Sequence, residues 1–433
     1  MLKDIIGTVG ARYLVAFFNL PLIFINGKVL GREGMGIVGL IYASANLAVI
    51  FNSIFCENTI VYFMNKYSLR YVFYPAYIWS LTGSFVSCGV MAVCGMLPEN
   101  YEWTVLALAV LISLTTANSM FLLGADKVKI FNLMFIIQGT GLFLTVIFLY
   151  YIAGFKNING YMTGLFSAYS IAFVYSCVSM FPLFGKQTGN KADKSLLETL
   201  KEMSVYGLWS CVDNLAEGLT TRLNYFLIRH WGGYGNVGLL DSGTKISESV
   251  WHISSSVSYV EYKEVSKTSE KEIQKNITIK WLGLTFCALT AVMLIVVFIP
   301  EWLYTEYLLS AEFAGIRKII IGLSVGIVAF GSNRILSHYF TGSGKVKYSA
   351  YSSITGLAVL LIAGYILIPK YGVSGAAITT SIAYCCMLLF SIIVFMKQTN
   401  TKFGDFFRII RVVFLSHLHT IEKRRKAPHG RLK

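Results

Sequence analysis

The chain has 433 residues, of which 55% are hydrophobic and 14% are charged. Because soluble proteins carry roughly 25% charged residues, this composition excludes a soluble enzyme. The formal net charge of +15 comes from residues between apolar runs and in one tail. That placement sets membrane orientation, so no nucleic-acid partner is expected. The eight cysteines fall almost all inside apolar runs without metal-ligand spacing, which predicts neither disulfides nor a metal site.

Runs of about 20 apolar residues, the length that crosses a bilayer core, recur along the chain. They predict membrane spans near residues 10–24, 36–54, 72–97, 103–123, 130–153, 161–184, 205–228, 237–259, 277–300, 316–339, 348–368 and 372–396. The first run follows Lys3 and Arg12 but lacks a small-residue cleavage site, so we count it as a helix and not as a signal peptide. The expected fold class is an all-α polytopic membrane protein with about 12 transmembrane helices.

Lys and Arg between the spans indicate orientation, because cytoplasmic loops accumulate these residues. They concentrate in alternate loops and in the tail, whereas the opposite loops hold scattered cations and several acids. Both termini are therefore predicted to be cytoplasmic. The expected divisions are an N-lobe over 1–185, a cytoplasmic linker over 186–204, a C-lobe over 205–396 and a basic amphipathic tail over 397–433. We expect the tail to lie on anionic membrane lipids.

An internal repeat relates the two lobes. The sequence Gly124-Ala-Asp-Lys-Val-Lys129 of the N-lobe recurs in the C-lobe as Gly342-Ser-Gly-Lys-Val-Lys347. Further matches in the same order, at slightly smaller separations, are Gly160 with Gly375 and Gly31 with Gly232. Since six spans per lobe is an even number, both copies cross the membrane in the same direction. The repeat therefore predicts a pseudo-twofold axis along the membrane normal.

Three glycine-rich segments, Leu30–Gly36, Gly232–Leu239 and Tyr371–Ala377, resemble those of polysaccharide-export flippases. These are the O-antigen and capsule repeat-unit translocases of the multidrug/oligosaccharidyl-lipid/polysaccharide superfamily. The resemblance implies two six-helix lobes around a central cavity. It also implies translocation of an undecaprenyl-pyrophosphate-linked oligosaccharide across the bacterial inner membrane by alternating access, with no enzymatic activity. The partners implied are this lipid-linked oligosaccharide and a complex with the polysaccharide polymerase or ligase.

Charged residues inside the predicted spans mark a candidate site, because a charge at the bilayer centre costs about 2.5–3.5 kcal/mol and normally faces a cavity or a partner. Four residues of the eighth span share one helix face at the spacing i, i+4, i+7 and i+11: Asp241, Lys245, Glu248 and His252. The seventh span adds Asp213, Glu217 and Arg222. Arg12 precedes Gly31 by as many residues as Asp213 precedes Gly232, so we expect a gate or an exchangeable ion pair between Arg12 and Asp213.

The roles expected for these residues follow from their charge. Arginine offers a fork to phosphate oxygens, and the cations expected to attract the pyrophosphate and anionic sugars are Arg12, Arg222, Lys245 and Arg334. The residues expected to couple H+ or Na+, or to act as a gate, are Asp213, Glu217, Asp241, Glu248 and His252. No other cofactor is expected. One competing interpretation is that Arg334 and His338 anchor the tenth span at the interface. Another is that the pairs Asp241–Lys245 and Lys245–Glu248 only neutralise one another so that the eighth span can insert.

Two other functions compete with flipping. An ion-coupled multidrug or cation exporter of the same superfamily would share the repeat and the acids, but would favour an acidic cavity. A membrane glycosyltransferase or polymerase would need a sizeable extramembrane loop with paired carboxylates or a metal motif, and the longest polar segments here are lysine-rich and lack both.

Overall fold

The computed structural model describes residues 2–64, 66–185, 196–266, 270–402 and 404. The first half holds α1 (Leu2–Asn52), α2 (Asn58–Met64), α3 (Leu69–Val93), α4 (Glu102–Gly124), α5 (Val128–Ile147), η1 (Phe148–Ile152) and α6 (Ile158–Gly185). The second half holds α7 (Leu196–Glu248), α8 (Trp251–Ser266), α9 (Lys271–Phe298), η2 (Leu303–Leu308), η3 (Ala311–Phe313), α10 (Ile316–Gly342) and α11 (Lys347–Thr399). The described residues contain no strand. Eight of their helices are long and apolar enough to cross a membrane, which confirms the predicted polytopic class.

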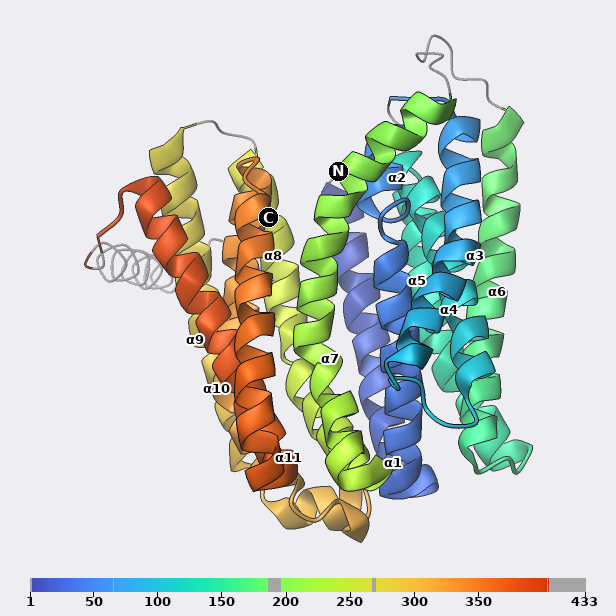
Figure 1. The fold of residues 1–433 in the computed structure, drawn as a ribbon, viewed down its shortest axis with the longest axis vertical. Coiled ribbons are helices and arrows are strands. Elements are labelled where there is room, and N and C mark those ends of the chain that lie inside the picture. The colour runs from blue at the N-terminus through green and yellow to red at the C-terminus, as the bar shows by residue number, and fades with distance from the viewer. Residues whose placement is uncertain (1, 65, 186–195, 267–269, 403, 405–433) are drawn as a thin grey trace, which may run out of the picture.

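Three helices are interrupted by a glycine with a left-handed backbone. The φ angles are 66° at Gly31 in α1, 70° at Gly233 in α7 and 56° at Gly372 in α11. Glycine adopts this conformation without strain because it lacks Cβ. If straight, helices of 51 to 53 residues would extend about 75–80 Å, more than twice the thickness of a bilayer core. Each helix instead turns back at its glycine and crosses twice (Figure 1). With α8 continuing α7, each half makes six passes, as predicted.

These reversals define two ends of the molecule. We call the end with the three kink glycines the hairpin side, and the opposite end, where α1 begins and α11 ends, the terminal side. In Figure 1 the hairpin side is at the bottom, where α1, α7 and α11 turn. The terminal side is at the top, where α6 ends and α7 begins.

The ends of α4 and α10 confirm one part of the repeat. The Lys127 amide donates to the Leu122 carbonyl at 2.9 Å, and the Lys345 amide donates to the Phe340 carbonyl at 2.7 Å. The residue before each lysine, Asp126 or Gly344, has a positive φ, as this helix-ending turn requires. The two copies of the repeated hexapeptide therefore share one local geometry.

Reciprocal backbone contacts join the halves on the hairpin side. A Cβ on Gly36 would lie 1.9 Å from the Tyr234 carbonyl oxygen, and a Cβ on Gly238 would lie 1.8 Å from the Arg32 carbonyl oxygen. Gly36 and Gly238 are separated along the chain by the same number of residues as Arg32 and Tyr234. Each half thus makes the same contact with the other, which is the geometry of a twofold axis between them.

The same separation corrects the predicted register near the kinks. The two kink glycines, Gly31 and Gly233, are as far apart along the chain as Gly36 and Gly238. The match of Gly31 with Gly232 is wrong by one residue, because the chain reverses at the second glycine of the Gly232-Gly233 pair.

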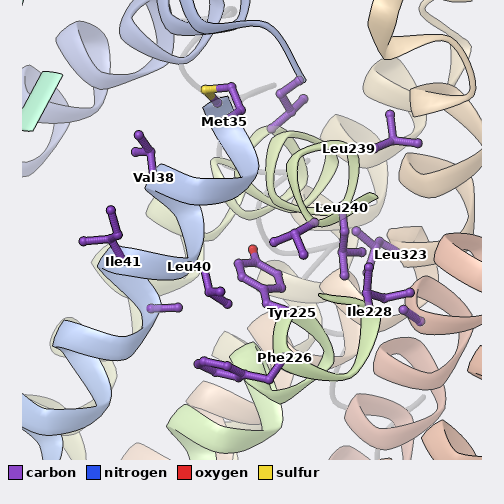
Figure 2. Close-up of a cluster of buried hydrophobic side chains, with 14 of the residues drawn as sticks. Met35, Val38, Leu40, Ile41, Tyr225, Phe226, Ile228, Leu239, Leu240 and Leu323 are labelled. Carbon is purple, nitrogen blue, oxygen red and sulfur yellow. The ribbon is translucent and has the colours of Figure 1, made fainter. Parts of the chain in front are cut away.

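An apolar core packs α1 against α7, and α7 against α10. In Figure 2, Met35, Val38 and Leu40 of α1 lie in one cluster with Tyr225 and Leu240 of α7. None of these five side chains is more than 2% exposed. The core therefore holds the two halves together through side chains as well as through the glycine contacts.

The element boundaries differ from the expectation in three places. Residues 196–204, expected in the linker, begin α7, while 186–195 lie outside the described residues. The segment 30–36, most of which lies between the first two predicted spans, is helical except at Gly31. The eighth span is broken, since α7 ends at Glu248 and α8 begins at Trp251. Nearly all of the predicted basic tail, 405–433, lies outside the described residues.

Candidate functional site

A cavity of ≈ 460 Å³ lies between the two halves. Its N-half wall comes from α1, α5 and α6, and its C-half wall comes from α7, α8 and α10. The C-half wall carries every charged or imidazole side chain of the lining: Arg222, Lys245, Glu248, His252 and Arg334. The structure therefore brings five of the nine predicted site residues together around one space.

The break in the eighth span positions two of these residues. Glu248 is the last residue of α7, and His252 is the second residue of α8. The Ser249 amide donates to the Lys245 carbonyl at 3.1 Å, whereas the Val250 amide turns back to the Ser247 carbonyl at 3.3 Å. A helix interrupted at membrane depth is tolerated where it faces a cavity, and Ser249 itself lines the cavity.

Arg222 and Glu248 form a two-pronged ion pair. Arg222 Nη1 donates to Glu248 Oε1 at 2.8 Å, and Nη2 donates to Oε2 at 2.7 Å. Nη1 also donates to the Tyr225 hydroxyl at 3.1 Å. The pairing fixes the guanidinium plane and leaves 27% of the Arg222 side chain exposed, so that part of the cation is available to a ligand in the cavity.

Lys245 pairs with an acid that lies behind it. Lys245 Nζ is 2.7 Å from Asp241 Oδ2, and the Asp241 side chain is only 2% exposed whereas that of Lys245 is 27% exposed. Asp241 packs against Gly39, where a Cβ would lie 2.8 Å from the carboxylate carbon. Asp241 is not in the cavity lining, so the cavity meets the lysine and not its counter-ion.

Arg334 lies on aromatic rings. Its guanidinium carbon is 5.2 Å from the ring centroids of both Trp251 and Phe330, a distance at which a cation is attracted to the ring face. Arg334 Nη1 donates to Ser255 Oγ at 2.8 Å, and Nη2 is 3.9 Å from Glu217 Oε1. Trp251 is itself held by a hydrogen bond from Nε1 to the Ile327 carbonyl at 2.9 Å. Trp251 was not among the residues predicted from the sequence. Its position directly before His252, a predicted site residue, could have indicated it.

The expected pair of Arg12 and Asp213 stays a prediction. Ser353 Oγ on α11 donates to Asp213 Oδ1 at 2.8 Å. In the corrected register, which aligns Gly31 with Gly233, Arg12 corresponds to Asn214 and not to Asp213. Arg12, Asp213 and Glu217 are not in the cavity lining.

The N-half wall carries amides and tyrosines, which the sequence reasoning did not single out. Asn19 and Gln138 are half-buried and make no side-chain hydrogen bond to any described residue. Asn26, by contrast, accepts a hydrogen bond from the Tyr150 hydroxyl at 3.1 Å. The other polar groups of this wall are the hydroxyls of Tyr42, Tyr161 and Tyr169. These residues were not predicted because uncharged polar residues do not stand out among the apolar residues of a membrane span.

Two arginines connect the halves on the hairpin side. Arg32 Nε donates to the Gly235 carbonyl at 2.7 Å. Arg229 Nη1 donates to the Leu97 carbonyl at 2.6 Å, and its Nη2 donates to Glu99 Oε1 at 3.0 Å. We call these two contacts the Arg32 latch and the Arg229 latch. In the sequence, both cations were only among the scattered charges of the loops opposite to the predicted cytoplasmic side.

Within the described residues, no group of three or more His, Cys, Asp or Glu side chains is arranged to hold a metal ion. The arrangement instead offers fixed cations on one wall, neutral polar groups on the other, and apolar surface between them. Such a cavity can hold a charged headgroup away from hydrocarbon without any covalent chemistry.

Comparisons with known proteins place this fold. The structure matches an inward-facing multidrug resistance MATE family transporter of the MOP superfamily with a TM-score of 0.70 and 15% identity, covering 89% of this chain and 94% of that one. It matches the lipid II flippase MurJ, in an inward closed conformation, with a TM-score of 0.67 and 15% identity, covering 97% of this chain and 93% of that one. The chain therefore has the fold of MOP-superfamily transporters.

Comparison of amino-acid sequences finds a shorter match than comparison of structures does. No family model matches the chain. The probable multidrug resistance protein NorM of Bacillus cereus is 25% identical over 146 residues, which is 32% of this chain and 32% of that protein. The chain thus matches about a third of the length of this curated relative.

Proposed function

We propose that this chain is a transporter that moves an undecaprenyl-pyrophosphate-linked oligosaccharide repeat unit across the bacterial inner membrane by alternating access, for the synthesis of surface polysaccharide. The observation that carries the proposal is the charge of the cavity lining, which has three cations, Arg222, Lys245 and Arg334, and one acid, Glu248. Arginine and lysine so arranged suit pyrophosphate oxygens. The shared fold with a lipid II flippase supports the same substrate class.

Transport would follow from movement of the two halves about their contact. The Arg32 and Arg229 latches hold the hairpin side together in this structure. Release of both latches, with closure at the terminal side, would expose the cavity to the other face of the membrane, as in transporters built from repeated halves. We propose that the terminal side is cytoplasmic, that the tail lies on anionic lipid, and that a polymerase or ligase receives the product.

A second candidate is an exporter of lipophilic cations, coupled to H+ or Na+. The likeness to MATE transporters favours it, as do the acids Asp241 and Glu248. Its weakness is the geometry of those acids, since Asp241 is buried behind Lys245 and Glu248 is occupied by Arg222. In either case we assign ion coupling to acids of α7, with Asp213 and Glu217 as candidates.

The test is binding by the full-length protein in lipid nanodiscs of two probes, geranylgeranyl pyrophosphate and the cation tetraphenylphosphonium. We expect the pyrophosphate to bind and Arg334→Gln to weaken it about tenfold or more, because a hydrogen bond to a charged group contributes about 1.5–3 kcal/mol. Lys318→Gln, an exposed cation on the same helix, is the matched control. Binding of the phosphonium alone, or equal effects of both substitutions, would contradict the proposal.

A further inference from the structure

The two walls of the cavity differ in a way that the repeat does not produce. The C-half wall holds all the charges, whereas the N-half wall holds amides, tyrosines and apolar groups. When Gly31 is aligned with Gly233, the counterparts of Arg222, Lys245 and Glu248 are Leu20, Ala43 and Asn46, and when Gly124 is aligned with Gly342, the counterpart of Arg334 is Thr116. Every charged member of the site thus has an uncharged equivalent in the other half. The cavity is divided into a charged wall and a neutral wall.

The neutral wall contains polar groups that lack a partner within the described part of the protein. Asn19 on α1 and Gln138 on α5 come from different helices, both line the cavity, and neither side chain has a hydrogen bond to a described residue. An amide offers donors and an acceptor together and carries no charge. That combination suits the hydroxyl and acetamido groups of a sugar, and it is poorly suited to neutralising a phosphate or a cation.

Aromatic rings accompany these amides. Tyr42, Tyr161 and Tyr169 stand on the same wall. A pocket with much apolar and aromatic surface and a few placed polar groups fixes the orientation of its ligand. Tyrosine rings also offer a flat apolar surface to the face of a sugar ring.

We propose that the two halves recognise different parts of one substrate: the C-half wall holds the pyrophosphate, and the N-half wall, through Asn19 and Gln138, binds the uncharged sugar next to it. This inference rests on the proposed function and specifies its substrate, a lipid pyrophosphate whose first sugar is neutral. It also orients the substrate across the cavity, with the sugar towards α1 and α5.

The experiment compares two probes on the full-length protein in nanodiscs: geranylgeranyl pyrophosphate, and the same lipid pyrophosphate carrying one N-acetylglucosamine. Wild type should bind the sugar-bearing lipid more tightly. The double variant Asn19→Leu/Gln138→Met should weaken the sugar-bearing lipid about tenfold more than it weakens the bare lipid, since each lost hydrogen bond contributes about 0.5–1.5 kcal/mol. Arg334→Gln should weaken both lipids by a similar factor.

Two further variants keep the comparison interpretable. Gln138→Met alone should act in the same direction by a smaller factor, and it provides the comparison if the double variant does not fold. Asn276→Leu removes an exposed amide from α9, outside the cavity, and should leave the ratio of the two affinities as in wild type.

The outcomes separate the two proposals. If wild type binds both lipids equally, or if the double variant weakens both by the same factor, the division of the substrate between the walls is overturned and the proposed function stands. If wild type binds neither lipid, both proposals are overturned.

Discussion

The guanidinium of Arg222 and the carboxylate of Glu248 meet through two parallel hydrogen bonds, of 2.8 Å and 2.7 Å, where the eighth span breaks. This pair keeps a cation in the cavity while limiting its charge. Glu248 therefore lowers the affinity of the site for anions, and its removal should raise that affinity.

Glu248→Gln should raise the affinity for geranylgeranyl pyrophosphate several-fold and lower the free energy of unfolding by about 2 kcal/mol. The charge of Arg222 becomes available to the ligand, while the protein loses hydrogen bonds between charged groups, which contribute about 1.5–3 kcal/mol. Binding and denaturant unfolding of the variant measure both effects. Glu306→Gln, an exposed acid on η2, is the control, and an affinity that falls in Glu248→Gln would contradict the prediction.

The Arg229 latch should depend on the backbone contact more than on the ion pair. The Glu99 side chain is 81% exposed, whereas that of Arg229 is 16% exposed, and exposed ion pairs contribute about 0–1 kcal/mol. Arg229→Ala also removes the hydrogen bond to the Leu97 carbonyl. We expect hydrogen exchange in the segment 229–238 to rise about tenfold in Arg229→Ala and to change little in Glu99→Ala. Equal effects would show that the ion pair dominates.

Gly36 should not tolerate even a methyl group. A Cβ there would lie 1.9 Å from the Tyr234 carbonyl oxygen, and backbone cannot swing aside as a side chain can. Gly36→Ala should cost about 1–3 kcal/mol or more of unfolding free energy and loosen the hairpin side. Gly89→Ala on α3 is the matched control, because no atom lies within 4 Å of its added Cβ and alanine favours a helix. Equal stability of the two variants would contradict the contact.

Stability should fall as pH rises because of Glu57, which lies between α1 and α2, outside the membrane spans. Loss of solvation raises the pKa of Glu57 from 4.5 to about 7. Asn214 Nδ2 donates to Glu57 Oε2 at 3.1 Å, and no described cation pairs with the carboxylate. Between pH 4.5 and 7 the folded chain holds a proton that the unfolded chain has released, so stability decreases across this window as pH rises.

Glu57→Gln should flatten this dependence and make the protein more stable than wild type above pH 7, by about 2 kcal/mol. Thermal unfolding midpoints of both proteins from pH 5 to pH 8 measure it. Glu102→Gln, an exposed acid at the start of α4, controls for the loss of one carboxylate. If the stability of wild type relative to Glu57→Gln instead increases from pH 5 to pH 7, the raised pKa of Glu57 is refuted.

Apolar run length predicted most of the architecture because a membrane span needs a fixed number of residues. The hexapeptides at Gly124 and Gly342 located the repeat, and their shared helix-ending turn explains why that match was reliable. The continuity of α1, α7 and α11 was not predictable in the same way. A single glycine with positive φ reverses a helix without any loop, and the sequence does not show which glycine of a cluster adopts that conformation.

The candidate site was predictable where charge marked it. Arg222, Lys245, Glu248, His252 and Arg334 stand out in apolar spans, and all five line the cavity. Asn19 and Gln138 do not stand out, because an amide inside a membrane helix is common in packing. Arg12 and Asp213 were paired by a register that was one residue off, and one residue turns a side chain by about 100° around a helix.

The contact of Gly36 with Tyr234, and of Gly238 with Arg32, involves only main-chain atoms of the two carbonyl residues. Such a joint makes no demand on the side chains that surround it. After a duplication, each copy could therefore change the amino acids of its cavity wall without altering this backbone joint. That freedom explains why the backbones of the two copies are nearly symmetric although the charged residues of the cavity lie in one copy only.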